Sequence, residues 1–163
     1  MIDTYCIRDV ADSDLSQICR FPQNREELLF MYPRAEYPLT IQQLRDAIYQ
    51  RSDSKVLESG EQVVAFANFY EVSPNSHCTI GNVIVNPSHR GSGAATFLVR
   101  EMERIAKQKY QVPEVRISCF NSNVAALLLY SKLGYLPFTI EKRTGTDGGF
   151  LALIKLKRML DTL

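Results

Sequence analysis

The sequence predicts an α/β (α+β) fold in which helices flank a mixed, mostly antiparallel central sheet. Strand-like segments follow one another through short turns at residues 59–60, 73–76 and 145–149, as in a sheet of neighbouring strands. Longer segments instead carry apolar residues at the spacing of an amphipathic helix. With 163 residues, of which 45% are hydrophobic, the chain suffices for one domain, residues 1–163, with its own core.

The expected elements follow one another along the whole chain. The first strand is Thr4–Arg8, and Asp12 or Ser13 caps the short helix after it. Residues 21–40 are punctuated by prolines and are expected to be irregular. A helix then begins at Thr40. The remaining strands are expected at Lys55–Glu58, Val63–Tyr70, Cys78–Val85, Val115–Cys119, Leu136–Ile140 and Phe150–Leu156.

Two helices are expected in the second half of the chain. The first is half-buried, and Glu103 and Lys107 stand one turn apart on its polar side, where they should support each other. The second spans Val124–Lys132 and is apolar almost all round, which predicts a buried helix. Asn123 is a good N-cap for it, and Gly134 should end it in the left-handed conformation.

Charge and composition narrow the function. Lysine and arginine total 19, and aspartate and glutamate total 18, a near-balance that gives no electrostatic footprint for nucleic acid. Asp3 and Asp9 interrupt the N-terminal stretch, and no apolar run approaches the length of a membrane span. We therefore expect a cytoplasmic protein that binds neither nucleic acid nor a membrane.

The cysteines and histidines do not form a metal-binding pattern. They lie scattered, without a CxxC pair, at Cys6, Cys19, His77, Cys78, His89 and Cys119. No metal site is expected, and the cysteines should be reduced thiols, mostly packed as small hydrophobic residues. Cys119 ends a strand, but a nucleophilic role would require an activating histidine, which no motif supplies.

The most informative motif is the run HRGSGAA at residues 89–95. It follows the strand-like Val83–Val85 and opens a helical segment. Arg90, Gly93 and Ala95 fit the pattern Arg/Gln-x-x-Gly-x-Gly/Ala, in which small residues let backbone N–H groups surround an anion. The start of the helix adds unpaired N–H groups and the positive end of its dipole. The run therefore predicts a pyrophosphate site.

Two other phosphate-binding motifs fit less well. A Walker loop has Lys and then Ser or Thr after its last glycine, whereas Ala94 and Ala95 follow Gly93. A dinucleotide fingerprint has a glycine three residues after its second one, and Thr96 stands there instead. For these residues alone, a glycine-containing loop beside an arginine, without a ligand, is the remaining alternative.

A second motif lies further along the chain. It reproduces the signature Asn-x-x-Ala-x-x-x-Tyr-x-Lys-x-Gly-Phe/Tyr with Asn123, Ala126, Tyr130, Lys132, Gly134 and Tyr135. The two motifs, in this order and at this separation, resemble those of the GNAT acyl-CoA-dependent N-acetyltransferases over about residues 78–136. One departure is that the strand Thr79–Val85 lacks the glutamate with which many members assist deprotonation of the amine.

The resemblance implies acetyl-CoA as the acyl donor and a sheet whose fourth and fifth strands splay apart to admit it. The residues that should hold this cosubstrate are Val83, Ile84, Val85, Arg90, Gly91, Ser92, Gly93, Ala94, Ala95, Thr96 and Asn123. A bulge near Gly81 and Asn82 would supply the strand distortion, since glycine inside a strand often marks one. A backbone N–H group there would face the thioester carbonyl.

The resemblance also implies the chemistry, direct transfer of an acetyl group to a primary amine. Tyr130 stands where the family places the hydroxyl that protonates the departing sulfur, although a tyrosine at such a helix position is commonly a core aromatic. Glu36 and Glu71 are remote proton acceptors at best and fit solvated acids better. No general base is therefore assigned, and His89 is given no role.

The acceptor should bind near residues 21–37, where the family varies most. The candidates for contact, each of which could equally be structural, are Phe21, Asn24, Tyr32 and Asn68. The aromatic residues favour an acceptor with apolar or aromatic bulk beside its amine, such as a small-molecule, lysine-like or peptide amine. The sequence leaves a homodimer open. The alternative function is a non-catalytic acyl-CoA-binding sensor or interaction module, which would bind the donor without amine-dependent release of thiol.

Overall fold

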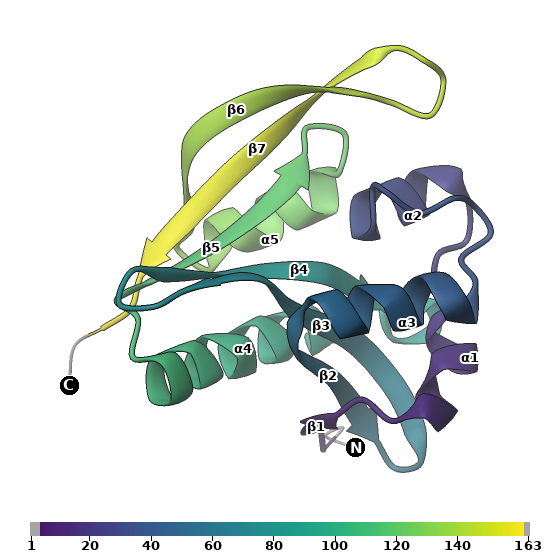
Figure 1. Cartoon of the computed structure of the whole chain (residues 1–163), viewed down its shortest axis with the longest axis horizontal. Helices are drawn as coiled ribbons and strands as arrows, with labels where there is room; N and C mark the ends of the chain where they lie inside the picture. Colours follow the sequence, from purple (N-terminus) through teal and green to yellow (C-terminus); the bar gives the residue numbers. More distant parts are fainter. Residues whose placement is uncertain (1–3, 162–163) are drawn as a thin grey trace.

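A sheet of seven strands runs through residues 4–161, the part of the chain that the computed structural model describes (Figure 1). The strand order is β1-β2-β3-β4-β5-β7-β6, and each neighbouring pair is antiparallel except β4 and β5. The strands are β1 (Cys6–Asp9), β2 (Ser52–Ser59), β3 (Gln62–Ser73), β4 (His77–Val85), β5 (Glu114–Phe120), β6 (Leu136–Thr144) and β7 (Phe150–Met159). The predicted mixed, mostly antiparallel sheet is confirmed.

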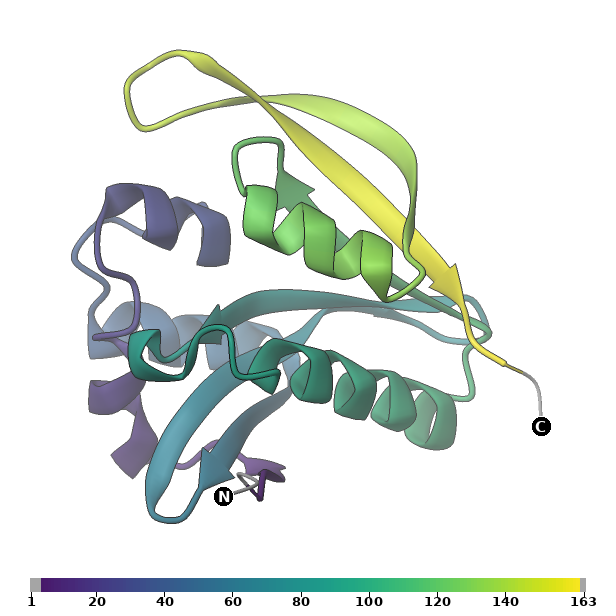
Figure 2. The ribbon, with the colours of Figure 1, turned by 180° about the vertical axis from the view of Figure 1, so that it is seen from behind.

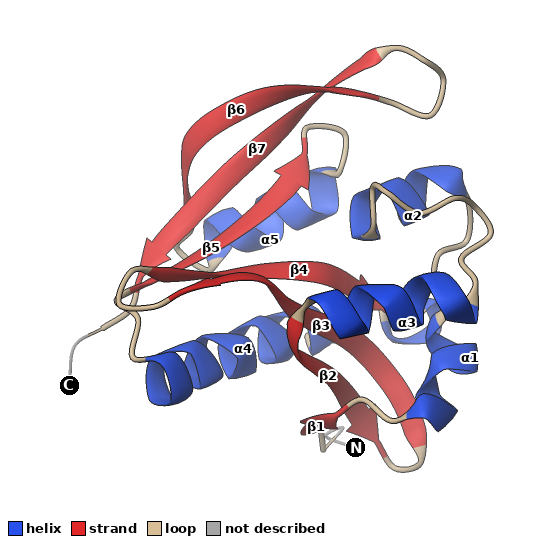
Figure 3. Cartoon of the chain, in the orientation of Figure 1, coloured by secondary structure: helices blue, strands red, loops and turns tan. Residues whose placement is uncertain are grey.

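Helices cover both faces of this sheet (Figure 3). They are α1 (Leu15–Ile18), α2 (Arg25–Met31), α3 (Ile41–Gln50), α4 (Ala94–Tyr110) and α5 (Val124–Lys132). Apolar residues of α4 and α5 form one core cluster on one face of the sheet, where Figure 2 shows both helices. A second cluster joins α1, α2 and α3 to the other face. Among residues 4–161, no helix is both long and apolar enough to cross a membrane.

The two parallel strands separate part-way along their length. They pair from His77 with Glu114 as far as Ile80 with Ile117. β4 nevertheless continues to Val85, and β5 continues to Phe120. The predicted splay of the fourth and fifth strands is therefore present, and it leaves the backbone of the second half of β4 open toward β5.

A bulge in β4 lies at the point where the splay begins. Phe66 of β3 pairs with Ile84, but Asn68 pairs with Gly81, so β4 contains one extra residue in this interval. Asn82 there has a left-handed backbone, with φ of 51°. Its buried amide donates a hydrogen bond of 2.9 Å to the carbonyl of Met31 and accepts one of 2.8 Å from Asn68. The predicted bulge near Gly81 and Asn82 is confirmed.

Several local predictions for the helix ends are also confirmed. The side chain of Thr40 accepts a hydrogen bond from the backbone of the first turn of α3, and Asn123 does the same for α5. Gly134 follows α5 with φ of +95°, as a glycine that ends a helix does. These features depend on a few adjacent residues, which explains why the sequence alone predicts them.

Two helix predictions are wrong. Residues 21–40 contain the helix α2, whose N-cap is Asn24; the neighbouring Pro22 and Pro33 lie outside this helix and delimit it. α5 is not buried all round, since Val124 is 59% and Leu128 67% exposed. Because α5 packs on the sheet with only one side, its outward apolar residues stay in contact with solvent.

The predicted pairing of Glu103 with Lys107 is also wrong. Glu103 is only 6% exposed, and its carboxylate accepts a hydrogen bond of 2.8 Å from the Tyr135 hydroxyl. Arg100 and Arg158 form ion pairs with it at 3.0 and 3.1 Å. Glu103 therefore connects α4 to the end of α5 and to β7, and the favourable interactions of its charge compensate for its burial.

We predict that Glu103→Gln destabilises the fold by about 1–3 kcal/mol, because it leaves Arg100 and Arg158 without their shared counter-charge. Glu101→Gln is the matched control. Glu101 also pairs with an arginine of α4, Arg104, but on the more exposed side of the helix. We therefore expect Glu101→Gln to lower the free energy of unfolding by no more than about 0.5 kcal/mol. Urea unfolding measures both changes, and equal losses would contradict the connecting role of Glu103.

Candidate active site

The loop between β4 and α4 has the geometry of an anion site. Gly91 and Gly93 have φ of +76° and +86°, and no atom lies within 4 Å of the position that a Cβ would take on either residue. Gly93 is the N-cap of α4 and offers no side chain to the first turn. The first N–H groups of α4 have no partner within the helix. They are therefore available, beside open space, to an anionic ligand.

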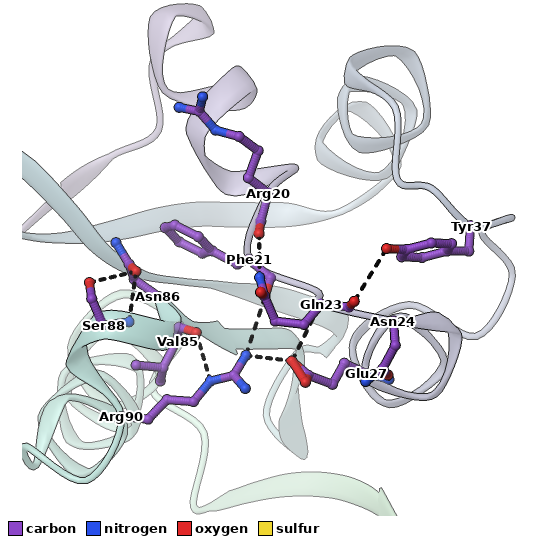
Figure 4. Close-up of polar contacts among 10 residues, drawn as sticks. All are labelled: Arg20, Phe21, Gln23, Asn24, Glu27, Tyr37, Val85, Asn86, Ser88 and Arg90. Carbon is purple, nitrogen blue, oxygen red and sulfur yellow. Dashed lines mark hydrogen bonds and ion pairs between the residues drawn. The ribbon is translucent and has the colours of Figure 1, made fainter.

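The guanidinium group of Arg90 is engaged within the protein (Figure 4). It forms an ion pair of 2.6 Å with Glu27 of α2. It also donates hydrogen bonds of 3.3 Å to the backbone carbonyls of Phe21 and Val85. Arg90 thus fastens the loop to α2, and the loop backbone, rather than this side chain, is the part of HRGSGAA that is free to contact a phosphate.

The predicted donor-binding residues of β4 border the splay. Val83 and Val85 are half-buried and pack against the cluster of α4 and α5, whereas Ile84 belongs to the opposite cluster. Asn123 lies just after β5, and its side chain accepts a hydrogen bond of 3.4 Å from the Ala126 amide. Asn123 is therefore a helix cap in this structure, near the end of the strand that faces β4.

Tyr130 lies inside the core cluster that α4 and α5 form with the sheet. It is 4% exposed and shares this cluster with Cys119 of β5. Its ring centre is 6.1 Å from that of Tyr135. Burial, and to a smaller extent the neighbouring Cys119, raises the pKa of Tyr130 above its usual value. The hydroxyl group therefore keeps its proton near neutral pH and is able to donate a hydrogen bond.

Cys119 has the properties of a packed thiol. Burial raises its pKa to about 11, so that at neutral pH only about one molecule in 10⁴ carries the thiolate. Both histidines have other neighbours: His77 contacts Ser76 at 2.8 Å, and His89 contacts Ser88 at 3.1 Å. The expected free state of all the cysteines is confirmed.

The predicted acceptor residues occupy different environments. Phe21 is 2% exposed within the core of α1, α2 and α3, and Asn24 caps α2 through a bond of 2.9 Å to Glu27. Asn68 is fully buried and bonded to Asn82. Arg51 contacts two of these four predicted acceptor residues. Its guanidinium lies 5.5 Å from the ring centre of Tyr32 and 3.3 Å from the side-chain oxygen of Asn68.

Two features near the predicted acceptor residues were not predicted from the sequence. One is Arg51 itself, since an arginine before a strand gives no local signal of its partners. The other is a pocket of about 450 Å³ between α2 and the β6–β7 turn. It is lined by Arg25, Leu28, Leu29, Pro33, Ala35, Glu36, Tyr37, Thr144, Gly145 and Thr146. The residues of the turn are distant in sequence from α2, so only the fold shows their proximity.

A family model for the GNAT acetyltransferase family matches residues 18–135, which include both sequence motifs and the splayed strands. The chain belongs to this family. GNAT enzymes are acetyl-CoA-dependent N-acyltransferases that act on small-molecule or peptide amines, so acetyl-CoA is the acyl donor here. The open loop backbone and the unpaired half of β4 fit a pyrophosphate and an extended pantetheine arm, respectively.

Solved N-acetyltransferases share this GNAT fold over nearly the whole chain. The ribosomal-protein-S18-alanine N-acetyltransferase of Escherichia coli is 21% identical, with a TM-score of 0.74 and coverage of 98% of this chain and 96% of that one. The spermidine N-acetyltransferase of Vibrio cholerae, solved with CoA and spermine, is 15% identical, with a TM-score of 0.79 and 95% coverage of both chains. No curated protein sequence matches the chain significantly.

We predict that Gly93→Val abolishes the rise in thermal midpoint that saturating acetyl-CoA produces. A donor at about 100 times its dissociation constant adds roughly 2.7 kcal/mol to stability, and a valine side chain would fill the open space beside the loop. Gly60→Val is the matched control, because Gly60 in the β2–β3 turn also has a positive φ, of +62°, and open surroundings.

Both substitutions strain the backbone by about 1–2 kcal/mol or more, and both should lower the midpoint without ligand. Only Gly93→Val should lose the response to acetyl-CoA. Differential scanning fluorimetry measures the two responses. A folded Gly93→Val variant with the wild-type shift would remove this loop from the donor site.

Proposed function

We propose that this GNAT enzyme moves an acetyl group from acetyl-CoA to a primary amine by direct attack, with Tyr130 as the general acid. The observation that carries the proposal is the position of Tyr130. Its buried, protonated hydroxyl lies near Cys119 of β5, on the strand that faces the unpaired half of β4. A donor thioester held between these strands would have its sulfur within reach of α5.

The transfer begins with attack of a neutral amine on the thioester carbonyl carbon. The carbonyl oxygen gains charge as the new C–N bond forms, and a backbone N–H group at the Asn82 bulge is the proposed donor to it. The C–S bond then breaks, and the departing sulfur takes the Tyr130 proton. Proton loss from the nitrogen completes the amide, and the tyrosinate regains a proton from solvent.

The proposed donor site consists of the β4 backbone and the phosphate loop. Val83, Ile84 and Val85 would bind the pantetheine arm, with Asn123 beside it, and the backbone of residues 90–96 would bind the pyrophosphate. Arg90 supplies positive charge to this loop, but its ion pair with Glu27 offsets part of that charge. Glycine at positions 91 and 93 lets the ligand approach the backbone closely.

Deprotonation of the acceptor is the more demanding proton transfer. A lysine-like amine, with a pKa of about 10.4, costs roughly 4.6 kcal/mol to neutralise at pH 7. Glu71 lies 3.5 Å from His77 at the far end of β3, whereas Glu36 lines the pocket between α2 and the β6–β7 turn. Neither carboxylate is assigned as the general base of the proposed reaction.

The cytoplasm is the proposed compartment. All four cysteines are free, and Cys6 is exposed to solvent. An exposed thiol in a chain with three further thiols persists most readily in a reducing environment. The proposed reaction does not depend on the compartment.

The first test of the mechanism is Tyr130→Phe, which keeps the ring and its packing but removes the acidic proton. If the hydroxyl protonates the leaving sulfur, kcat should fall about 10²- to 10⁴-fold while the dissociation constant of acetyl-CoA stays nearly unchanged. Free-thiol release across a panel of primary amines measures kcat, and calorimetry measures donor binding.

Tyr135→Phe is the matched control for this test. Tyr135 is also a buried tyrosine of the same core, but its hydroxyl donates to Glu103, so its loss should reduce stability without a specific fall in kcat. A Tyr130→Phe rate within about threefold of wild type would remove Tyr130 from catalysis. Donor binding without thiol release for every amine would instead support the sensor function.

The second test concerns a covalent route through Cys119. We predict that Cys119→Ala retains most of the activity, because the buried thiol ionises too little to act as a nucleophile at neutral pH. Intact-protein mass spectrometry of wild type with acetyl-CoA alone should detect no acetylated enzyme. An acetyl group on Cys119 that passes to added amine would overturn direct transfer.

A further inference from the structure

Arg51 occupies an unusual position on the acceptor side of the sheet. It is half-buried between the end of α3 and the start of β2. Its guanidinium lies 5.5 Å from the ring centre of Tyr32 and 5.1 Å from that of Tyr70. One hydrogen bond of 3.3 Å connects it to Asn68. Most of its five N–H donors are thus left for another ligand.

The charge of Arg51 is not balanced within the part of the chain that the structure describes. Most arginines there form ion pairs with carboxylates: Arg8, Arg45, Arg90, Arg100, Arg104, Arg116, Arg143 and Arg158. The groups that act electrostatically on Arg51 are the hydroxyls of Tyr32 and Tyr70 and the cation of Arg34. Burial lowers the pKa of Arg51, which is the cost of desolvating this charge.

Arg51 also lies at the start of the splay. Its Nη1 atom is 2.6 Å from the position that a Cβ would take on Gly81. Gly81 is the first residue of β4 beyond the pairing with β5, which ends at Ile80. The guanidinium therefore lies against the strand at the point where an acceptor amine must approach the donor thioester.

We propose that Arg51 binds the carboxylate of the acceptor, so that the substrate is a free amino acid. This inference rests on the proposed amine acetylation. A guanidinium matches a carboxylate with two parallel N–H donors, and a carboxylate supplies the counter-charge that Arg51 lacks. The position beside Gly81 places the carboxylate close to the reacting amine, as in a free amino acid.

The same surroundings disfavour a polycationic acceptor. Arg51 and Arg34 are both cations and act on each other repulsively, and a polyamine would add further positive charge beside them. The guanidinium carbon of Arg51 lies over the rings of Tyr32 and Tyr70, and no hydrogen bond to either hydroxyl takes up its N–H donors, so an N–H edge stays available to the carboxylate. Asn68, held by Asn82, fixes the orientation of that edge.

The test compares amino acids with their carboxamides, which keep the amine and side chain but lose the carboxylate charge. Alanine, methionine, phenylalanine and glutamate, each beside its carboxamide, are assayed by thiol release from acetyl-CoA. Wild type should show a KM about 10- to 100-fold lower for the preferred amino acid than for its carboxamide, with similar kcat. Equal KM values would overturn the proposal without affecting the proposed function.

Arg51→Gln should raise the KM of the amino acid by the same 10- to 100-fold and leave that of the carboxamide nearly unchanged. Arg51→Lys should restore part of the preference, since it keeps the charge but loses the paired donors. Arg45→Gln, which removes an exposed arginine of α3 that pairs with Asp12, is the matched control and should change either KM by less than about threefold. Equal KM increases for both substrates would assign Arg51 a structural role and overturn the proposal.

A binding measurement separates this inference from the proposed reaction. With CoA present, the preferred amino acid should raise the thermal midpoint of wild type, and Arg51→Gln should lose this rise while it keeps the response to acetyl-CoA. Absence of thiol release with every amine would overturn the proposed acetylation, but an amino-acid-dependent rise that requires Arg51 would still support the carboxylate site. A rise that persists in Arg51→Gln would overturn it.

Discussion

The separation of β4 from β5 after Ile80 is the constraint on which the rest of the site depends. A regular parallel pair would bond the β4 backbone to β5 along its whole length and would leave no space for a donor between them. The bulge at Asn82 changes the direction of β4, and its energetic cost is offset because the Asn82 amide is satisfied by Met31 and Asn68. In the proposed reaction, the roles of residues 90–96 and of Tyr130 both depend on this opening.

The polar network at the bulge also organises the acceptor side. Arg51, Asn68 and Asn82 form a chain of hydrogen bonds from the junction of α3 and β2 through β3 to β4. A buried polar group that lacks a hydrogen-bond partner costs free energy, so each member of such a network needs a partner. The asparagines are satisfied within the fold, whereas the guanidinium is not. This contrast distinguishes the residues that shape the site from the one that can recognise a substrate.

The donor side could be predicted from the sequence because its features are local. The small residues of the loop at positions 91–95, the cap at Asn123 and the bulge at Asn82 each leave a mark in adjacent residues. The acceptor side could not be predicted, because Arg51 meets Tyr32 and Tyr70 only after three elements have folded. Glu103 was misjudged for the same reason: its partner Arg158 comes from the last strand. The helix α2 has only seven residues and lies between two prolines. Its apolar periodicity was therefore too weak to predict a helix there.

The contacts that hold α2 in place can couple the binding of the two substrates. This helix is tied to β4 by the bond from Asn82 to Met31, and to the phosphate loop by the ion pair of Glu27 with Arg90. A molecule that displaces α2 would therefore also disturb the bulge of β4 and the loop that contains Arg90. Thermodynamic linkage makes this coupling reciprocal, so that each substrate changes the affinity for the other by the same factor. Such coupling would pass through two contacts of one short helix.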